Sequence, residues 1–342
     1  MRVGILTSGG DCQALNATMR GLALTLYRNV KDVEIIGFID GYKGLMYEKY
    51  KKMKPKDFYD ILNVGGSILG NSRCPFKRMR IIENGFDKVK AMKNTYKKLE
   101  LDCLVVLGGN GSIKSANMLS QEGLNVIALP KTIDNDAWGT DYTFGYSSAT
   151  AIATRYLDEI KTTAASHSRV FVIEVMGHKV GHICLSAGIA AGADVILLPE
   201  IPYDIKVVAK KVKETLKNEK NYAIIACAEG AISEADALMK RKDYKAKALA
   251  RNGRSVAYEV ADELSQEIDA EIRVSCIGHA QRGGNPNSYD REISTRFGVE
   301  GARLIIKKHY GEYVVLQGNH VTHIPLEATA GKLKYVDTEG EI

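Results

Sequence analysis

The sequence lacks the features that mark membrane proteins, disulfide-stabilised modules and nucleic-acid-binding proteins. No apolar run approaches the roughly 20 residues that cross a bilayer, and the chain opens with the strand-like residues 2–6 rather than with a signal peptide. Its six cysteines stand singly, without CxxC spacing, which indicates reduced thiols. The net charge is only +6, and Lys and Arg form no tract interleaved with aromatic residues. We therefore expect a cytoplasmic protein that binds neither membrane nor nucleic acid, with a mild positive excess that suits small anionic substrates.

Short runs of Val, Ile and Leu alternate with longer segments of helical period along all 342 residues, a length sufficient for two domains. Nearly all of these runs are apolar on both faces, as are strands inside a parallel sheet that helices cover on both sides. The sequence therefore predicts a doubly wound α/β architecture, in which ligands bind beyond the carboxyl ends of the strands. The expected strands are residues 3–6, 34–38, 103–107, 126–129, 170–175, 195–198, 222–226, 273–277 and 313–316.

The segment after the expected strand at 126–129 carries the residue types of a phosphoryl-transfer site. It places Lys131 shortly before Asp134 and Asp136, two carboxylates separated by one residue. One carboxylate can accept a proton from a substrate hydroxyl, the other can hold a metal ion on the transferring phosphate, and the lysine can meet the developing charge. Aspartates also form turns without any chemistry, but the lysine beside them favours the catalytic interpretation.

Glycine-rich turns follow other expected strands. Residues 7–11 read TSGGD and residues 108–112 read GGNGS, and both precede a helical segment. Bare amides at a helix N-terminus favour a phosphate, although a tight strand-to-helix turn needs glycine in any case. Neither turn fits GxxxxGKS/T or GxGxxG, so neither a P-loop nor a dinucleotide fingerprint is present. A third turn, at 278–284, places His279 and Arg282 after another strand, where arginine can fork onto a phosphate.

Five motifs together resemble the 6-phosphofructokinase family, of the phosphofructokinase A type, and they occur in the family's order. The motifs are TSGGD at 7–11, GGNGS at 108–112, PKTIDND at 130–136, SHSRVFVIEVMG at 166–177 and GHAQRGG at 278–284. The resemblance implies an enzyme of glycolysis that transfers a phosphoryl group to the 1-hydroxyl of fructose 6-phosphate, yielding fructose 1,6-bisphosphate, with Mg²⁺ as cofactor. It also implies a homotetramer or homodimer, with sugar-phosphate sites between subunits.

The same resemblance implies two doubly wound α/β domains with mainly parallel sheets. A phosphoryl-donor-binding domain would comprise residues 1–145 plus about 281–310. A sugar-phosphate-binding domain would comprise residues 146–280 plus the C-terminal tail.

Roles for particular residues follow from the resemblance as well. Asp134 resembles the family's catalytic base, with Lys131 and Thr132 beside it, and Asp136 and Asn110 stand where the family organises magnesium. The other positions that match the donor site are Gly10, Arg73, Cys74, Gly109, Gly111 and Ser112, in addition to Asn110. The positions that match the sugar-phosphate site, in addition to Thr132 and Asp134, are Met176, Gly177, His178, Glu229, His279 and Arg282, with Arg169 and Arg273 matching arginines that reach in from the adjacent subunit.

Departures from the family pattern leave the donor open. The family's loop reads GGDGS in ATP users and GGDDS in pyrophosphate users, whereas Asn110 weakens or moves metal binding and Gly111 leaves room for the α-phosphate of a nucleotide. Lys131 stands where ordinary ATP-using members carry glycine. A lysine at this position is typical of pyrophosphate users and of a mixed group. We favour ATP, because an aspartate at position 111 would exclude the α-phosphate of a nucleotide, and we give the lack of that block more weight than the presence of Lys131. Pyrophosphate stays as the alternative.

A second alternative is not an active enzyme at all. Asn110 and His178 both remove groups that the family uses to speed the reaction, since many members carry arginine at the position of His178. The chain could then be a catalytically weak, sugar-phosphate-binding regulatory subunit. Retention of Lys131, Asp134 and Asp136 argues against that interpretation.

Overall fold

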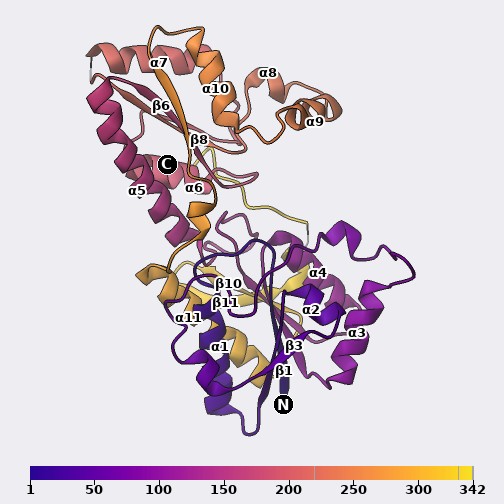
Figure 1. Cartoon of the computed structure of the whole chain (residues 1–342). Helices are drawn as coiled ribbons and strands as arrows, with labels where there is room; N and C mark the ends of the chain where they lie inside the picture. The colour runs from indigo at the N-terminus through magenta and orange to yellow at the C-terminus, as the bar shows by residue number, and fades with distance from the viewer. Residues whose placement is uncertain (219, 330, 341–342) are drawn as a thin grey trace. The chain divides into compact units, whose positions relative to one another are not determined.

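The computed structural model describes residues 1–218, 220–329 and 331–340, and the chain divides into two compact units (Figure 1). Unit 1 consists of Met1–Ser148 and Arg282–Lys334, and unit 2 consists of Ala149–Gln281 and Tyr335–Ile342. The chain passes from one unit to the other within helix α5 (Tyr146–His167), within the 3-10 helix η3 (Gly278–Arg282) and between Lys334 and Tyr335. Among the described residues, no helix is long and apolar enough to cross a membrane.

Unit 1 is built on a seven-stranded sheet in the order β11-β10-β5-β4-β1-β2-β3. The strands are β1 (Arg2–Ser8), β2 (Glu34–Phe38), β3 (Tyr50–Met53), β4 (Cys103–Gly108), β5 (Val126–Pro130), β10 (Glu312–Gln317) and β11 (His320–Pro325). The five central strands run parallel, and β3 and β11 pair antiparallel at the two edges. Every residue of β4 and β5 is buried, as expected for parallel strands covered on both faces.

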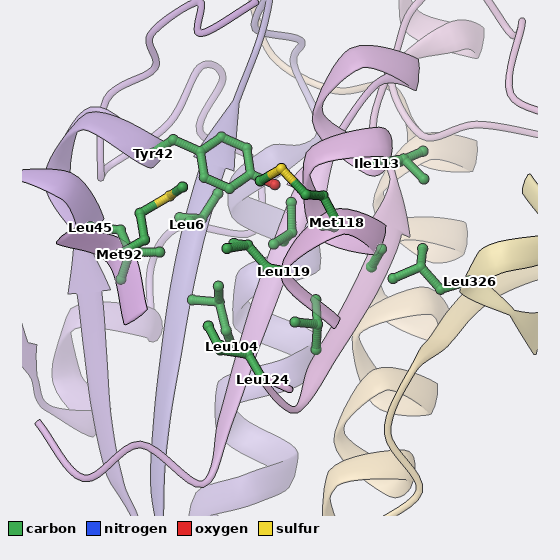
Figure 2. Close-up of a cluster of buried hydrophobic side chains, with 14 of the residues drawn as sticks. Leu6, Tyr42, Leu45, Met92, Leu104, Ile113, Met118, Leu119, Leu124 and Leu326 are labelled. Carbon is green, nitrogen blue, oxygen red and sulfur yellow. The ribbon is translucent and has the colours of Figure 1, made fainter. Parts of the chain in front are cut away.

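Helices cover both faces of this sheet (Figure 1). On one face lie α1 (Leu15–Asn29) and α11 (Ser288–Ile306), and on the other lie α2 (Tyr42–Met46), α3 (Lys88–Lys98) and α4 (Asn110–Gln121). Figure 2 shows apolar side chains of α2, α3 and α4 meeting over β1 and β4, where Tyr42, Met92 and Leu119 are fully buried. On the first face, Gly21 lets α1 approach α11 closely, because a Cβ there would lie 2.5 Å from the carbonyl oxygen of Thr295. The 3-10 helices of unit 1 are η1 (Pro55–Phe58), η2 (Phe76–Arg78) and η4 (Leu326–Thr329).

Unit 2 contains a four-stranded sheet in the order β7-β8-β6-β9, in which every neighbouring pair is parallel. The strands are β6 (Val170–Val175), β7 (Val195–Leu197), β8 (Ala223–Ala228) and β9 (Ile272–Cys276). Helices α7 (Ile205–Asn218) and α10 (Val256–Ser265) share one apolar cluster with the sheet, and α5 and α6 (His182–Ala190) lie on its other side (Figure 1). Helix α9 (Arg241–Ala250), which follows the short α8 (Glu234–Ala237), buries none of its residues. The predicted α/β fold class with mainly parallel sheets is confirmed.

Two edge strands and one segment differ from the expectation. The sequences of β3 and β11 read YKKM and HVTHIP, and neither contains the apolar run that identifies a buried parallel strand. The sequence predicts β10 but places residues beyond 310 in the second domain, whereas residues 311–334 lie in unit 1, because β10 pairs in parallel with β5.

Candidate active site

Three loops leave the sheet of unit 1 side by side. The parallel register pairs Ser8 with Gly108, and Gly108 with Pro130, so the residues that follow β1, β4 and β5 emerge at one edge. A Cβ built on Gly9 would lie 3.3 Å from Nζ of Lys131 and 3.6 Å from Oγ of Ser112, which shows how closely the three loops meet. The structure thus brings together the glycine turns and the lysine that the sequence analysis selects.

Lys131 occupies a dry position among these loops. Its side chain is only 2% exposed, and its ammonium donates a hydrogen bond to the carbonyl oxygen of Gly10. Burial lowers the pKa of Lys131 to about 8, against the opposing effect of the Asp134 carboxylate. The group therefore remains mainly protonated at neutral pH, in surroundings where its charge is poorly screened.

Hydrogen bonds between side chains and backbone groups hold the Asp134–Asp136 segment and its neighbours in place. The amide of Asp134 donates to Oγ1 of Thr132 at 3.1 Å, and Oγ1 of Thr143 donates to the carbonyl oxygen of Thr132 at 2.8 Å. Asn135 has a φ of 55°, a left-handed conformation that Asn tolerates, and its Oδ1 accepts from the amide of Thr143 at 3.0 Å. The result is two carboxylates in different environments, since Asp134 is partly exposed and Asp136 is buried.

Asp136 is linked to the first residue of α4. Nδ2 of Asn110 donates to Oδ2 of Asp136 at 2.7 Å and to its carbonyl oxygen at 3.2 Å. The two residues that the resemblance assigns to magnesium are therefore in direct contact. Among the described residues, there is no group of three or more His, Cys, Asp or Glu side chains that could together hold a metal ion.

The backbone at the donor turns is open. A Cβ on Gly111 would meet no atom within 4 Å, and Gly9 has a φ of 91° that favours glycine. Gly10 faces the guanidinium of Arg282, whose Nη1 would lie 2.9 Å from a Cβ on that glycine and donates to the carbonyl oxygen of Asp11 at 2.9 Å. Arg282, which the resemblance assigns to the sugar phosphate, thus lies against the first glycine turn within unit 1.

A pocket of unit 1 is lined by α2 and by the segment that follows Ser72. The carbonyl oxygen of Ser72 accepts from the amide of Gly9 at 3.1 Å, so the following Arg73 and Cys74 lie close to the turn. Both line a pocket in unit 1, and so do Lys43, Tyr47, Arg78 and Met79. Sequence reasoning selects Arg73 and Cys74 but misses Lys43 and Tyr47, which no motif marks and which only the folding of α2 brings here.

Unit 2 presents a second group of candidates at the carboxyl ends of its strands. Val175 pairs with Ala228, so the turns after β6 and β8 are neighbours. Oε1 of Glu229 accepts from the amides of Gly177 and His178 at 3.1 and 2.5 Å, and the amide of Met176 donates to Oε1 of Gln281 at 3.2 Å. The side chains of His178 and of His279, in η3, are exposed.

Arg169 and Arg273 do not join this group. They lie at the amino ends of β6 and β9, so the length of a six-residue strand, about 15–20 Å, separates them from Glu229. Nε of Arg169 donates to Glu271 at 2.7 Å, and a guanidinium nitrogen of Arg273 pairs with the same carboxylate. Their side chains are 25% and 54% exposed, respectively. The hydrogen bond from Arg169 and the charge of that guanidinium, followed by the charge of Arg273, lower the pKa of Glu271.

A parallel α/β fold with bare glycine turns, a buried lysine and two aspartates at one sheet edge defines a phosphotransferase. The chain belongs to the phosphofructokinase family, whose model matches residues 2–305. The ATP-dependent 6-phosphofructokinase of Spirochaeta thermophila is 48% identical over 97% of this chain and 92% of its own length. The ATP-dependent 6-phosphofructokinase 3 of Bacteroides thetaiotaomicron is 42% identical over 100% of this chain and 96% of its own.

Solved structures agree with the fold. Phosphofructokinase of Pichia pastoris in the T-state is 29% identical, with a TM-score of 0.83 over 96% of this chain and 35% of its own. A pyrophosphate-dependent phosphofructokinase from Nitrosospira multiformis has a TM-score of 0.84 over 98% of this chain and 86% of its own, but at 20% identity this likeness concerns the fold alone.

Proposed function

We propose that this chain is an ATP-dependent 6-phosphofructokinase, which transfers the γ-phosphoryl group of ATP to the 1-hydroxyl of fructose 6-phosphate. The observation that carries the proposal is the meeting of the two glycine turns, Lys131 and the Asp134 loop at one sheet edge of unit 1. Identities of 37–48% to relatives named ATP-dependent 6-phosphofructokinase support it. Unit 1 would bind the phosphoryl donor and unit 2 the sugar phosphate.

Two features of unit 1 favour ATP over pyrophosphate as the donor. The pocket with Arg73, Cys74 and Tyr47 gives a nucleoside an aromatic side chain and cations beside the turn, and pyrophosphate has no group to fill it. The open space at Gly111 leaves the α-phosphate room. Lys131 favours the alternative, because a fixed cation would help a donor that has no nucleoside contacts. Pyrophosphate therefore stays as the second candidate.

The proposed reaction needs one base and one fixed cation. The 1-hydroxyl oxygen attacks the γ-phosphorus, its proton passes to the Asp134 carboxylate, and the bond from the γ-phosphorus to the bridging oxygen breaks so that ADP leaves. Asp134 is suited to this role because it is partly exposed while Thr132 fixes its backbone. Lys131 stabilises the negative charge on the transferring group, and its burial makes that stabilisation strong.

The residues around Asn110 fit a magnesium ion that is carried in largely by the phosphates. Mg²⁺ is commonly held by one or two carboxylates together with substrate oxygens and water. Asp136 supplies a buried carboxylate and Asn110 a neutral amide oxygen, which is a sparse set consistent with the lack of a metal cluster among the described residues. When bound, the ion would neutralise phosphate charge. The side-chain amide of Asn110 also holds the Asp136 carboxylate in place through its hydrogen bond.

Recognition of the sugar phosphate is assigned to residues at the carboxyl ends of β6, β8 and β9. The residues that would bind it are Met176, Gly177, His178, Glu229, His279 and Arg282. Arg169 and Arg273 lie at the amino ends of the strands, far from the carboxyl ends where the other residues lie. This position favours a role in a neighbouring subunit of a homotetramer or homodimer. Two guanidinium groups that already share one carboxylate are well placed to bind a phosphate dianion together.

A donor panel tests the proposal. Formation of fructose 1,6-bisphosphate from fructose 6-phosphate should proceed with ATP at least tenfold faster than with pyrophosphate. Faster turnover with pyrophosphate would overturn the donor assignment and leave the phosphotransferase. If neither donor is used while fructose 6-phosphate still binds, the chain is the regulatory subunit instead.

A further inference from the structure

The C-terminal segment lies along the loop that continues from Asp136. Leu333 forms an antiparallel bridge with Ala137, and the amide of Lys334 donates to the carbonyl oxygen of Asp136 at 2.9 Å. Lys332 places its ammonium 5.4 Å from the ring centre of Trp138. The backbone of residues 333–334 thus forms a short clamp on residues 136–137, nearly 200 positions earlier in the sequence, and the exposed Lys332 stands outside it.

The side chain of Lys334 extends this clamp to the end of the loop. Its Nζ donates to the carbonyl oxygens of Thr140 and Asp141 at 2.9 and 2.8 Å. Burial lowers the pKa of Lys334 to about 8, while the nearby carboxylates of Asp141 and Asp136 oppose that shift. The ammonium therefore faces two backbone carbonyls and two acidic side chains in a partly dry position.

The opposite side of the loop is attached to the sheet. The amide of Leu316 donates to Oγ1 of Thr140 at 2.9 Å, and the amide of Gly318 donates to a carboxylate oxygen of Asp141 at 2.6 Å. These bonds fix one side of residues 140–141. On the other side, Lys334 donates the shorter bond to the carbonyl oxygen of Asp141, at 2.8 Å, and Nδ2 of Asn135 donates a longer one, at 3.4 Å. Only three residues separate Asp136 from Thr140, so movement at Thr140 is transmitted directly to the carboxylate pair.

We propose that Lys334 is a positioning residue, whose ammonium and backbone hold the 136–141 loop so that Asp134 and Asp136 keep their catalytic geometry. The proposal rests on the function proposed above. Lys334 acts through the loop and does not touch the substrate. It differs in this from Lys131, whose ammonium lies at the glycine turns.

The test compares three variants of the full chain. Lys334→Met removes the ammonium but keeps the aliphatic stem, Lys334→Arg keeps a cation, and Lys332→Met is the matched control in the same segment. We expect Lys334→Met to lower kcat about 10- to 100-fold with each KM within threefold, because loop geometry affects the transition state more than binding. Hydrogen exchange of residues 136–141 should accelerate. Lys334→Arg should recover kcat to within about threefold of wild type, and Lys332→Met should match wild type.

Each outcome decides the question. A wild-type kcat in Lys334→Met, a loss equal to that in Lys332→Met, or a loss without faster exchange in residues 136–141 would overturn the positioning role. If Lys334→Met does not fold, Lys334→Gln takes its place, and the same criteria apply. An inactive wild type with every donor would instead overturn the proposed function, and hydrogen exchange would still report whether Lys334 holds the loop.

Discussion

The two units place their candidate residues at the ends of parallel strands but treat them differently. In unit 1, Lys131 is 2% exposed and Asp136 is 8% exposed, and both are held by neighbours within the unit. In unit 2, His178 is exposed, and the partly exposed Arg169 and Arg273 both pair with the carboxylate of Glu271. A group that stabilises the charge developing in a transition state works best when it is buried and fixed, whereas a group that binds a dianion can stay solvated until the ligand binds.

This difference suggests a division of labour. Substitutions among the buried residues of unit 1 should lower kcat, and substitutions among the exposed residues of unit 2 should raise KM for the sugar phosphate. The largest expected effects lie in unit 1.

Replacing Asp134 with Ser should have the largest effect. We expect kcat to fall by roughly 10²–10⁴-fold with KM for fructose 6-phosphate within a small factor, because a general base acts in the transition state. Steady-state kinetics with ATP measure both constants. As the matched change in unit 2, Glu229→Gln should raise KM about tenfold, because it weakens the acceptor for two backbone amides, and leave kcat nearly unchanged. A rise in KM alone for Asp134→Ser would end its assignment as the base.

Gly111→Asp should have the next largest effect, and it sharpens the donor assignment. A carboxylate beside the α-phosphate should lower kcat/KM for ATP by about 10²-fold, because like charges at a few ångströms in a poorly screened site cost several kcal/mol. Gly111→Ala separates charge from size, and it should stay within about threefold of wild type because a Cβ there meets no atom within 4 Å. If both variants keep full ATP activity, the α-phosphate does not approach this position.

The buried Lys131 should make activity depend on pH. Its pKa of about 8 lies below the ordinary value of 10.5, so the rate should fall about tenfold per pH unit above 8 as the ammonium loses its proton. Between about 8 and 10.5 the unfolded chain binds more protons at this lysine, so its contribution to folding stability rises over the same range. Activity lost there is therefore not unfolding caused by Lys131.

Lys131→Arg provides the control for the pH profile, because an arginine stays charged throughout this range. The falling limb should move to higher pH in that variant. Lys334 shares a pKa of about 8, so a limb that stays in Lys131→Arg would point to Lys334 instead.

The sequence predicts the reactive residues of unit 1 better than the residues that surround and position them. Lys131, Asp134 and Gly111 belong to local motifs that follow buried apolar strands. Such motifs can be predicted from the sequence alone to lie at the carboxyl ends of a parallel sheet. Tyr47 and Lys334 carry no such mark, because one arrives through the folding of α2 and the other through a chain separation of nearly 200 residues. The edge strands were likewise missed because antiparallel pairing at an edge does not need an apolar run.

The smallest expected effect concerns the assembly of the sites. If Arg169 completes a site in a neighbouring subunit, mixing Asp134→Ser chains with Arg169→Ala chains should restore about a quarter of wild-type activity, assayed at a sugar-phosphate concentration far below the raised KM of Arg169→Ala. Random pairing leaves about that share of sites without either defect. The measurement is activity before and after subunit exchange verified by mass. Asp134→Ser mixed with Lys131→Met is the control, because both defects lie in unit 1 and every site then keeps one of them. Recovery in the control as well would show that the gain does not come from shared sites. No recovery in the test mixture despite exchange would show that Arg169 serves its own chain, and the exposed arginines of unit 2 would then need another explanation.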